Sequence, residues 1–132
     1  MLRVAVIDSN AVSRNLLSTL LVNGGHDVVG ASNTSSAGVA RMIKLQPHIV
    51  CIDVGHENAE GAEALAAVQA GLPKALVFMV SGKLDEDTVK EGAARGVRGF
   101  IVKPFNPETV LATIRNAVVK LARQHQPKSP DS

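Results

Sequence analysis

Residues 48–53 of the chain read His-Ile-Val-Cys-Ile-Asp, a short apolar run that ends in an acid. Its apolar side chains follow one another without interruption, whereas a strand with one solvated face alternates polar and apolar residues. An unbroken run of this length is typical of a strand that is buried on both faces, at the centre of a parallel sheet. We therefore expect a strand over Ile49–Ile52 with Asp53 at its carboxyl end.

Short β-branched runs alternate with longer helical segments on both sides of this strand. This alternation is the pattern of βαβ units around a parallel sheet. Strands are predicted over Leu2–Ile7, Asp27–Ala31, Ile49–Ile52, Ala75–Val80 and Arg98–Val102. The expected fold class is α/β: a doubly wound, five-stranded parallel sheet of order 2-1-3-4-5 with five helices, as in flavodoxin-like proteins.

The segments between the strands show helical periodicity. The apolar positions that carry it are Leu16, Leu17, Leu20 and Leu21 in the first segment, Val39, Met42 and Ile43 in the second, Leu65 and Val68 in the third, and Val110, Leu111, Ile114, Val118 and Leu121 in the last. Helix ends are predicted at Gly24-Gly25, before Pro47 and at Gly71, because glycine favours helix termination and proline restricts the residue before it.

Three of the helices have further distinguishing features. The third is predicted near Ala62–Ala70 and is rich in alanine. The fourth, about Glu86–Arg95, has few large apolar side chains, so we expect it to be thinly packed and mobile. The fifth begins with Asn106-Pro107-Glu108, which supplies an N-cap, a first-turn proline and an acid at the positive end of the helix dipole.

Composition limits what the chain can be. Its 132 residues suit one domain, which we place at 1–124, followed by a polar, proline-containing tail at 125–132 that we expect to be disordered. A formal charge of +2 and the absence of Trp and Tyr argue against nucleic-acid binding. Cys51 is expected to be a core residue. The sequence shows neither an N-terminal leader peptide nor an apolar stretch long enough to cross a membrane, so we expect a cytoplasmic protein with no membrane partner.

Chemically useful side chains follow four of the predicted strands: Asp8, Asp53, Ser81 and Lys103. In an open α/β sheet, ligands bind beyond the carboxyl ends of the strands, where the strand order reverses. With order 2-1-3-4-5, all four groups meet in one cleft. Two carboxylates, a hydroxyl and an ammonium group suit metal-assisted phosphoryl transfer to Asp53.

Other interpretations of these residues were weighed. Asp8 and Asp53 taken singly could be helix-capping or turn acids. The chain has no phosphate-binding Gly-x-x-x-x-Gly-Lys-Ser/Thr loop, no Gly-x-Gly-x-x-Gly and no Gly-x-Ser-x-Gly, so nucleotide hydrolysis, dinucleotide binding and ester hydrolysis are not supported. The four histidines show no metal-ligand spacing.

The pattern resembles the receiver domains of bacterial two-component response regulators over residues 1–122. Four stretches carry the resemblance: Val6-Ile7-Asp8-Ser9-Asn10 with Arg14, Cys51-Ile52-Asp53 with Gly61 eight residues later, Met79-Val80-Ser81-Gly82, and Gly99-Phe100-Ile101-Val102-Lys103-Pro104-Phe105. It implies a signalling phosphoprotein rather than an enzyme acting on external substrates, with metal-assisted self-phosphorylation from a donor and slow autodephosphorylation.

The resemblance also implies a role for each site residue. Asp53 would be the phosphoacceptor. Asp8, Asp53 and the main-chain carbonyl of Gly55 would bind Mg²⁺, and Lys103 and Ser81 would bind the phosphoryl oxygens. Ser81 and Phe100 would form a switch pair, and the peptide bond before Pro104 would be cis. A Phe100 that is simply a core aromatic at a strand end is an equally open interpretation.

Two departures from the family pattern weaken the expected metal site. The family has a second acid where this chain has Ser9, so Mg²⁺ should bind weakly, with the Ser9 hydroxyl holding a metal-bound water. His56-Glu57 replaces the family's Met-Pro after the acceptor. Glu57 either supplies a compensating carboxylate or is an ordinary surface residue.

The resemblance implies a stand-alone response regulator that accepts a phosphoryl group from a histidine kinase or a histidine phosphotransfer protein. Its downstream target would bind the face made by the fourth helix, the fifth strand and the fifth helix, and the fourth and fifth helices would also allow a homodimer. The alternatives are a pseudo-receiver that interacts constitutively without phosphorylation, or an unrelated flavodoxin-like binding domain.

Overall fold

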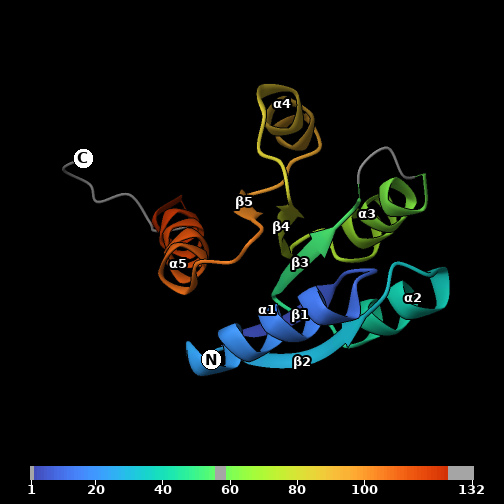
Figure 1. Cartoon of the computed structure of the whole chain (residues 1–132), viewed down its shortest axis with the longest axis horizontal. Helices are drawn as coiled ribbons and strands as arrows, with labels where there is room; N and C mark the ends of the chain where they lie inside the picture. Colours follow the sequence, from blue (N-terminus) through green and yellow to red (C-terminus); the bar gives the residue numbers. More distant parts are fainter. Residues whose placement is uncertain (1, 56–58, 125–132) are drawn as a thin grey trace, which may run out of the picture.

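The structure of the chain is a computed structural model that describes residues 2–55 and 59–124. His56, Glu57 and the 125–132 tail therefore lie outside the described residues. Five strands form one sheet: β1 (Arg3–Ile7), β2 (Asp27–Ser32), β3 (Ile49–Asp53), β4 (Leu76–Ser81) and β5 (Gly99–Val102). Their order is β2-β1-β3-β4-β5 and every neighbouring pair is parallel. The fold class and strand order predicted from the sequence are confirmed (Figure 1).

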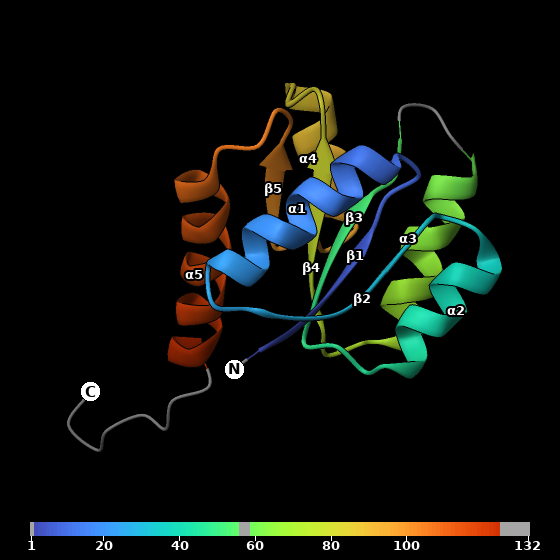
Figure 2. The same ribbon diagram turned by 60° about the horizontal axis from the view of Figure 1, so that its bottom comes forward.

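Five helices connect the described strands and continue beyond β5: α1 (Ala11–Asn23), α2 (Ser36–Lys44), α3 (Ala59–Gly71), α4 (Glu86–Ala94) and α5 (Pro107–Gln124). Figure 2 shows α1 and α5 on one side of the sheet, with α2 and α3 on the other. None of the helices within the described ranges is long and apolar enough to cross a membrane.

The sheet separates two apolar clusters, as a doubly wound fold requires. Leu17 and Leu21 of α1 and Ile114 of α5 pack on one face of the strands. Leu65 and Val68 of α3 pack on the other, together with Met42 of α2. The strand β3 contributes alternate residues to both clusters and is buried along its apolar run, which is why its sequence shows no polar alternation.

Some local predictions need correction. The helix α3 begins at Ala59 rather than near Ala62, with Glu60 in its first turn, where an acid is favoured by the helix dipole. Leu16 shares the periodic stripe of the first helix, but its side chain is 59% exposed, because α1 faces the sheet with Leu17 and Leu21, which are buried, and Leu20, which is partly buried. The predicted thin packing of α4 is borne out within the described chain: Gly92 is its single buried residue.

Candidate functional site

The candidate site lies at the carboxyl ends of β1, β3 and β5. Asp8 follows β1, Asp53 is the last residue of β3, and Lys103 follows β5. Because β1 and β3 are adjacent and parallel, their two carboxylates point to the same edge of the sheet. Asp8 is only 3% exposed, so its charge lies in a poorly solvated position and needs a partner.

Lys103 is that partner, and it binds both acids. Its Nζ lies 2.6 Å from Asp53 Oδ2 and 2.9 Å from Asp8 Oδ2. Burial alone lowers the pKa of Lys103, but its hydrogen bonds and charge interactions with Asp53 and Asp8 raise the pKa above its ordinary value. Lys103 is therefore a permanent cation at neutral pH, held between two carboxylates.

Asp8 is fixed by its neighbours in the first turn. Its Oδ1 accepts a hydrogen bond from the Asn10 N–H at 2.9 Å, and its carbonyl oxygen accepts one from Arg14 Nη1 at 2.8 Å. Asn10 in turn caps α1 by accepting from the Ser13 N–H. The motif formed by residues 8, 10 and 14 was visible in the sequence, but these bonds were not predicted. Ser9 lies exposed between the two anchored residues.

Asp53 is oriented from its other side. Its Oδ1 accepts a hydrogen bond from the Gly55 N–H at 2.8 Å, and Gly55 adopts a φ of +71°, which glycine tolerates without strain. Further along, a Cβ on Gly61 would overlap the carbonyl oxygen of Val54. The helix α3 thus approaches the end of β3 so closely that only glycine fits at position 61.

Ser81 ends β4 on the same rim, but its hydroxyl is not bonded to the two acids. Ser81 Oγ donates to the carbonyl of Lys83 at 2.8 Å and accepts from the Lys83 N–H at 3.1 Å. The structure thus brings Asp8, Asp53 and Lys103 into direct contact and leaves the Ser81 hydroxyl turned to the following loop. The Lys103–Pro104 peptide bond is cis.

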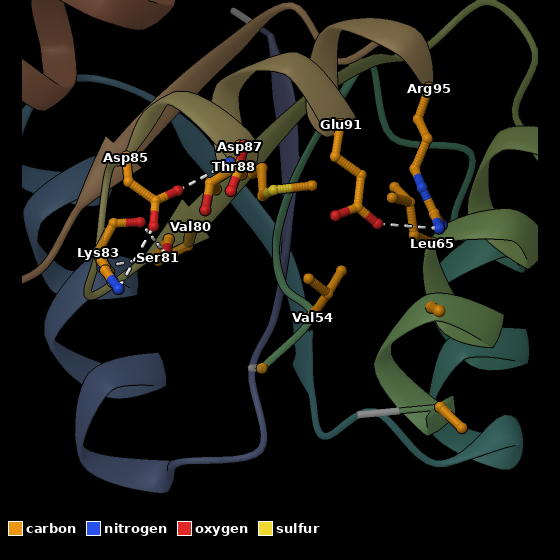
Figure 3. Close-up of a pocket in the computed structure, with 14 residues that line it drawn as sticks. Val54, Leu65, Val80, Ser81, Lys83, Asp85, Asp87, Thr88, Glu91 and Arg95 are labelled. Carbon is orange, nitrogen blue, oxygen red and sulfur yellow. Dashed lines mark hydrogen bonds and ion pairs between the residues drawn. The ribbon is translucent and has the colours of Figure 1, made fainter. Parts of the chain in front are cut away.

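A cavity of about 660 Å³ borders this rim between α3 and α4. Met79 and Leu65 contribute to its apolar lining, and Ser81, Lys83 and Glu91 to its polar lining. Figure 3 shows Glu91 of α4 and Arg95, the C-cap of that helix, above Leu65 of α3, with Ser81 and Lys83 at the other end of the cavity.

Two further residues from the sequence analysis, Cys51 and Phe100, lie in or against the apolar core. Cys51 is fully buried in β3, and burial raises the pKa of its thiol to about 12. The ring of Phe100 packs beside α4 against the apolar cluster that contains Met79. Sequence reasoning missed the glycine beneath this ring, Gly92, although a glycine inside a predicted helix was a usable signal.

A family model of the response regulator receiver domain matches residues 4–115. The chain belongs to the response regulator receiver family. It is thus a receiver of two-component signal transduction, a class of signalling proteins that are generally not enzymes.

Several relatives of this receiver are chemotaxis proteins. It is 28% identical to the chemotaxis protein CheY of Listeria monocytogenes over 117 residues, which covers 89% of this chain and 98% of that protein. It is also 28% identical to CheY of Thermotoga maritima over 112 residues, covering 85% of this chain and 93% of the relative. The crystal structure of CheY4 from Vibrio cholerae superposes with a TM-score of 0.76 at 28% identity, covering 89% of this chain and 98% of that one.

Proposed function

We propose that this receiver accepts a phosphoryl group on Asp53 from a phosphohistidine of a histidine kinase or a histidine phosphotransfer protein. The observation that carries the proposal is the contact of Lys103 Nζ with Asp53 Oδ2 and Asp8 Oδ2. This arrangement holds a cation beside the nucleophilic carboxylate, where the charge of an incoming phosphoryl group develops.

In the proposed reaction, an Asp53 oxygen attacks the phosphorus atom, the P–N bond of phosphohistidine breaks, and its electron pair returns to the imidazole nitrogen. The product is an acyl phosphate on Asp53, with a new O–P bond. Lys103 then exchanges part of its contact with the carboxylate for contact with a phosphoryl oxygen. Ser81 binds another phosphoryl oxygen after its hydroxyl leaves Lys83.

Receiver domains generally bind Mg²⁺ at this site, and the donor set of this chain fits a hard cation. Asp8 and Asp53 offer carboxylate oxygens, and Gly55 offers a main-chain carbonyl. When bound, Mg²⁺ would neutralise the phosphoryl oxygens during transfer. No group of three or more His, Cys, Asp or Glu residues among residues 2–55 and 59–124 forms a metal cluster. Because Ser9 stands where the family has a second acid, binding through two carboxylates, with Ser9 holding a metal-bound water, should be weak.

The proposed output is a contact with a downstream protein through α4, β5 and α5. Exposed apolar side chains support this face: Leu84 before α4, Val89 on α4 and Val102 at the end of β5. The same face could join two copies of the receiver, which sedimentation at several concentrations would test. Because the donor is a cytoplasmic kinase domain in this scheme, we infer a cytoplasmic location.

The decisive experiment is intact-mass measurement after incubation with Mg²⁺ and acetyl phosphate, beside Asp53→Asn. A single phosphoryl adduct that the variant lacks supports the proposal. Absence of the adduct at high metal concentration, together with failure to bind beryllofluoride, would leave a pseudo-receiver that interacts without phosphorylation. This second candidate function is supported by Ser9, which replaces the second acid of the family's metal site.

A further inference from the structure

The helix α4 contributes no large buried side chain to the core. Gly92 is the only residue of α4 that is buried, whereas α1 buries Leu17 and Leu21. A glycine in a helix interior lowers helix stability relative to alanine, so its presence calls for a packing reason.

The packing reason is the ring of Phe100. A Cβ on Gly92 would lie 2.6 Å from Phe100 Cζ and 2.7 Å from Phe100 Cε1, well inside van der Waals contact. The ring also packs against the apolar cluster on that face of the sheet, which includes Met79. The missing side chain of Gly92 thus leaves the space that the Phe100 ring occupies under α4.

The C-cap of α4 is attached to α3, because Gln69 donates a hydrogen bond to the carbonyl oxygen of Arg95. A further attachment of α4 runs through the loop before it. Asp85 caps α4 by accepting from the Thr88 N–H at 2.8 Å, and Lys83 Nζ lies 3.4 Å from Asp85 Oδ2. Lys83 is in turn bonded through its main chain to the Ser81 hydroxyl. On its α3 side, α4 borders the cavity of about 660 Å³ (Figure 3). Two attachments of α4, the Phe100 contact and the loop before the helix, therefore lead to the switch candidates, Ser81 and Phe100.

We propose that Gly92 is a positioning residue that holds the Phe100 ring under α4 while the Ser81 hydroxyl is bonded to Lys83. This inference rests on the proposed phosphorylation of Asp53. When Ser81 leaves Lys83 for the phosphoryl group, the ring moves into the vacated space and leaves Gly92, and α4 loses its main apolar support. A change that expels the ring from Gly92 therefore favours the phosphorylated arrangement by linkage.

The test adds a methyl group at the contact. In Gly92→Ala, the new Cβ takes the place of the ring, so we expect at least a threefold faster phosphorylation by acetyl phosphate. Replacing Phe100 with Leu removes the ring, so Gly92→Ala in that background should have no further effect on the rate. Ala93→Gly is the control for helix propensity, because Ala93 is exposed on the same helix. Its phosphorylation rate should match the parent.

A second measurement observes the ring itself. The chain has three Phe residues, so ¹⁹F NMR of protein labelled with fluorophenylalanine gives few signals, and Phe100→Leu identifies the one from Phe100. The ¹⁹F chemical shift of Phe100 should change in Gly92→Ala and should be the same as in the parent in Ala93→Gly. If Gly92→Ala unfolds the protein, the Gly92→Ala, Phe100→Leu double variant should fold again.

The outcomes separate the two proposals. An unmoved Phe100 signal, or a rate in Gly92→Ala that is unchanged or lower, overturns the role of Gly92. If the parent protein forms no Asp53 adduct, the proposed function fails, while the ¹⁹F shift still tests whether Gly92 positions the ring. An equal effect of Gly92→Ala with and without the Phe100 ring also overturns the inference, because it would show that helix propensity alone changed the rate.

Discussion

Asp8 and Asp53 share one cation: their Oδ2 atoms lie 2.9 Å and 2.6 Å from the same Lys103 Nζ. The two acids come from adjacent parallel strands, and the side chain between them comes from the far side of β4. In the proposed function, Mg²⁺ would bind oxygens of the same two carboxylates. Lys103 and Mg²⁺ would then compete for these carboxylates, while both would favour a phosphoryl group on Asp53.

Lys103→Met should separate these two effects. Without the competing ammonium group, Mg²⁺ is expected to bind on the order of tenfold more tightly, equivalent to about 1.4 kcal/mol. Phosphorylation by acetyl phosphate should fall by at least roughly tenfold, because a cation that contacts the transferring group is lost. Isothermal titration with Mg²⁺ and intact-mass kinetics measure the two quantities.

Lys90→Met is the matched control for Lys103→Met, because Lys90 pairs with Glu86 on the exposed surface of α4. Such surface pairs contribute little, so both quantities should match the parent. Metal affinity that drops in Lys103→Met would contradict competition for the shared oxygens.

Ser9→Asp should strengthen the metal site. It adds a carboxylate to the exposed turn between Asp8 and Asn10, and a further hard, charged ligand raises Mg²⁺ affinity. We expect an increase on the order of tenfold, about 1.4 kcal/mol, seen as a lower midpoint in a Mg²⁺ titration followed by NMR. Ser9→Asn introduces a side chain of the same size as that of Asp but without its charge, so its Mg²⁺ affinity should match that of the parent. Equal affinities for the Asp and Asn variants would show that Ser9 does not limit metal binding.

Gly61→Ala should destabilise the receiver. Its Cβ would overlap the carbonyl oxygen of Val54, a main-chain atom that cannot turn aside. Overpacking of this kind costs about 1–3 kcal/mol, and the shift of β3's end should also disturb Asp53. The denaturant midpoint measures the loss. Gly82→Ala is the control, because a Cβ there meets no atom within 4 Å; equal stability of the two variants would contradict the close approach of α3.

The sequence was enough to predict the sheet order and the meeting of Asp8, Asp53 and Lys103. Both predictions follow from the alternation of strands and helices, because the carboxyl ends of parallel strands meet at one edge of the sheet. The partner of the Ser81 hydroxyl was not predictable, because it is the main chain of Lys83 in an irregular loop. The exposure of Leu16 was also missed, since periodicity alone leaves the width of the buried face of a helix open.

The start of α3 and the position of Gly92 show the same limit. Helix boundaries depend on a few weak residue preferences at the helix ends, so the sequence could not decide whether α3 begins at Ala59 or near Ala62. Gly92 gave a signal, a glycine inside a helix, but its reason lies in the ring of Phe100 on another element. Local patterns thus predicted which elements form, and the contacts between elements required the structure.

Cys51 should be chemically inert in the folded receiver. It lies fully buried in β3, two residues before Asp53, and burial raises the pKa of its thiol to about 12. Because the raised pKa keeps the thiol protonated, the reactive thiolate is scarce even well above pH ~8.5, where an ordinary cysteine is half ionised. Reaction with a disulfide reagent should therefore be slow in buffer and immediate in denaturant.

The pH dependence of this reaction gives the sharper check. Raising the pH from about 7 to about 9 increases the thiolate of an exposed cysteine many-fold, but in the folded receiver the observed rate should follow the opening of β3. A native rate equal to that in denaturant would contradict the burial of Cys51. It would also mean that the strand carrying Asp53 opens readily, in which case Asp8, Asp53 and Lys103 could not hold a preorganised geometry for phosphoryl transfer.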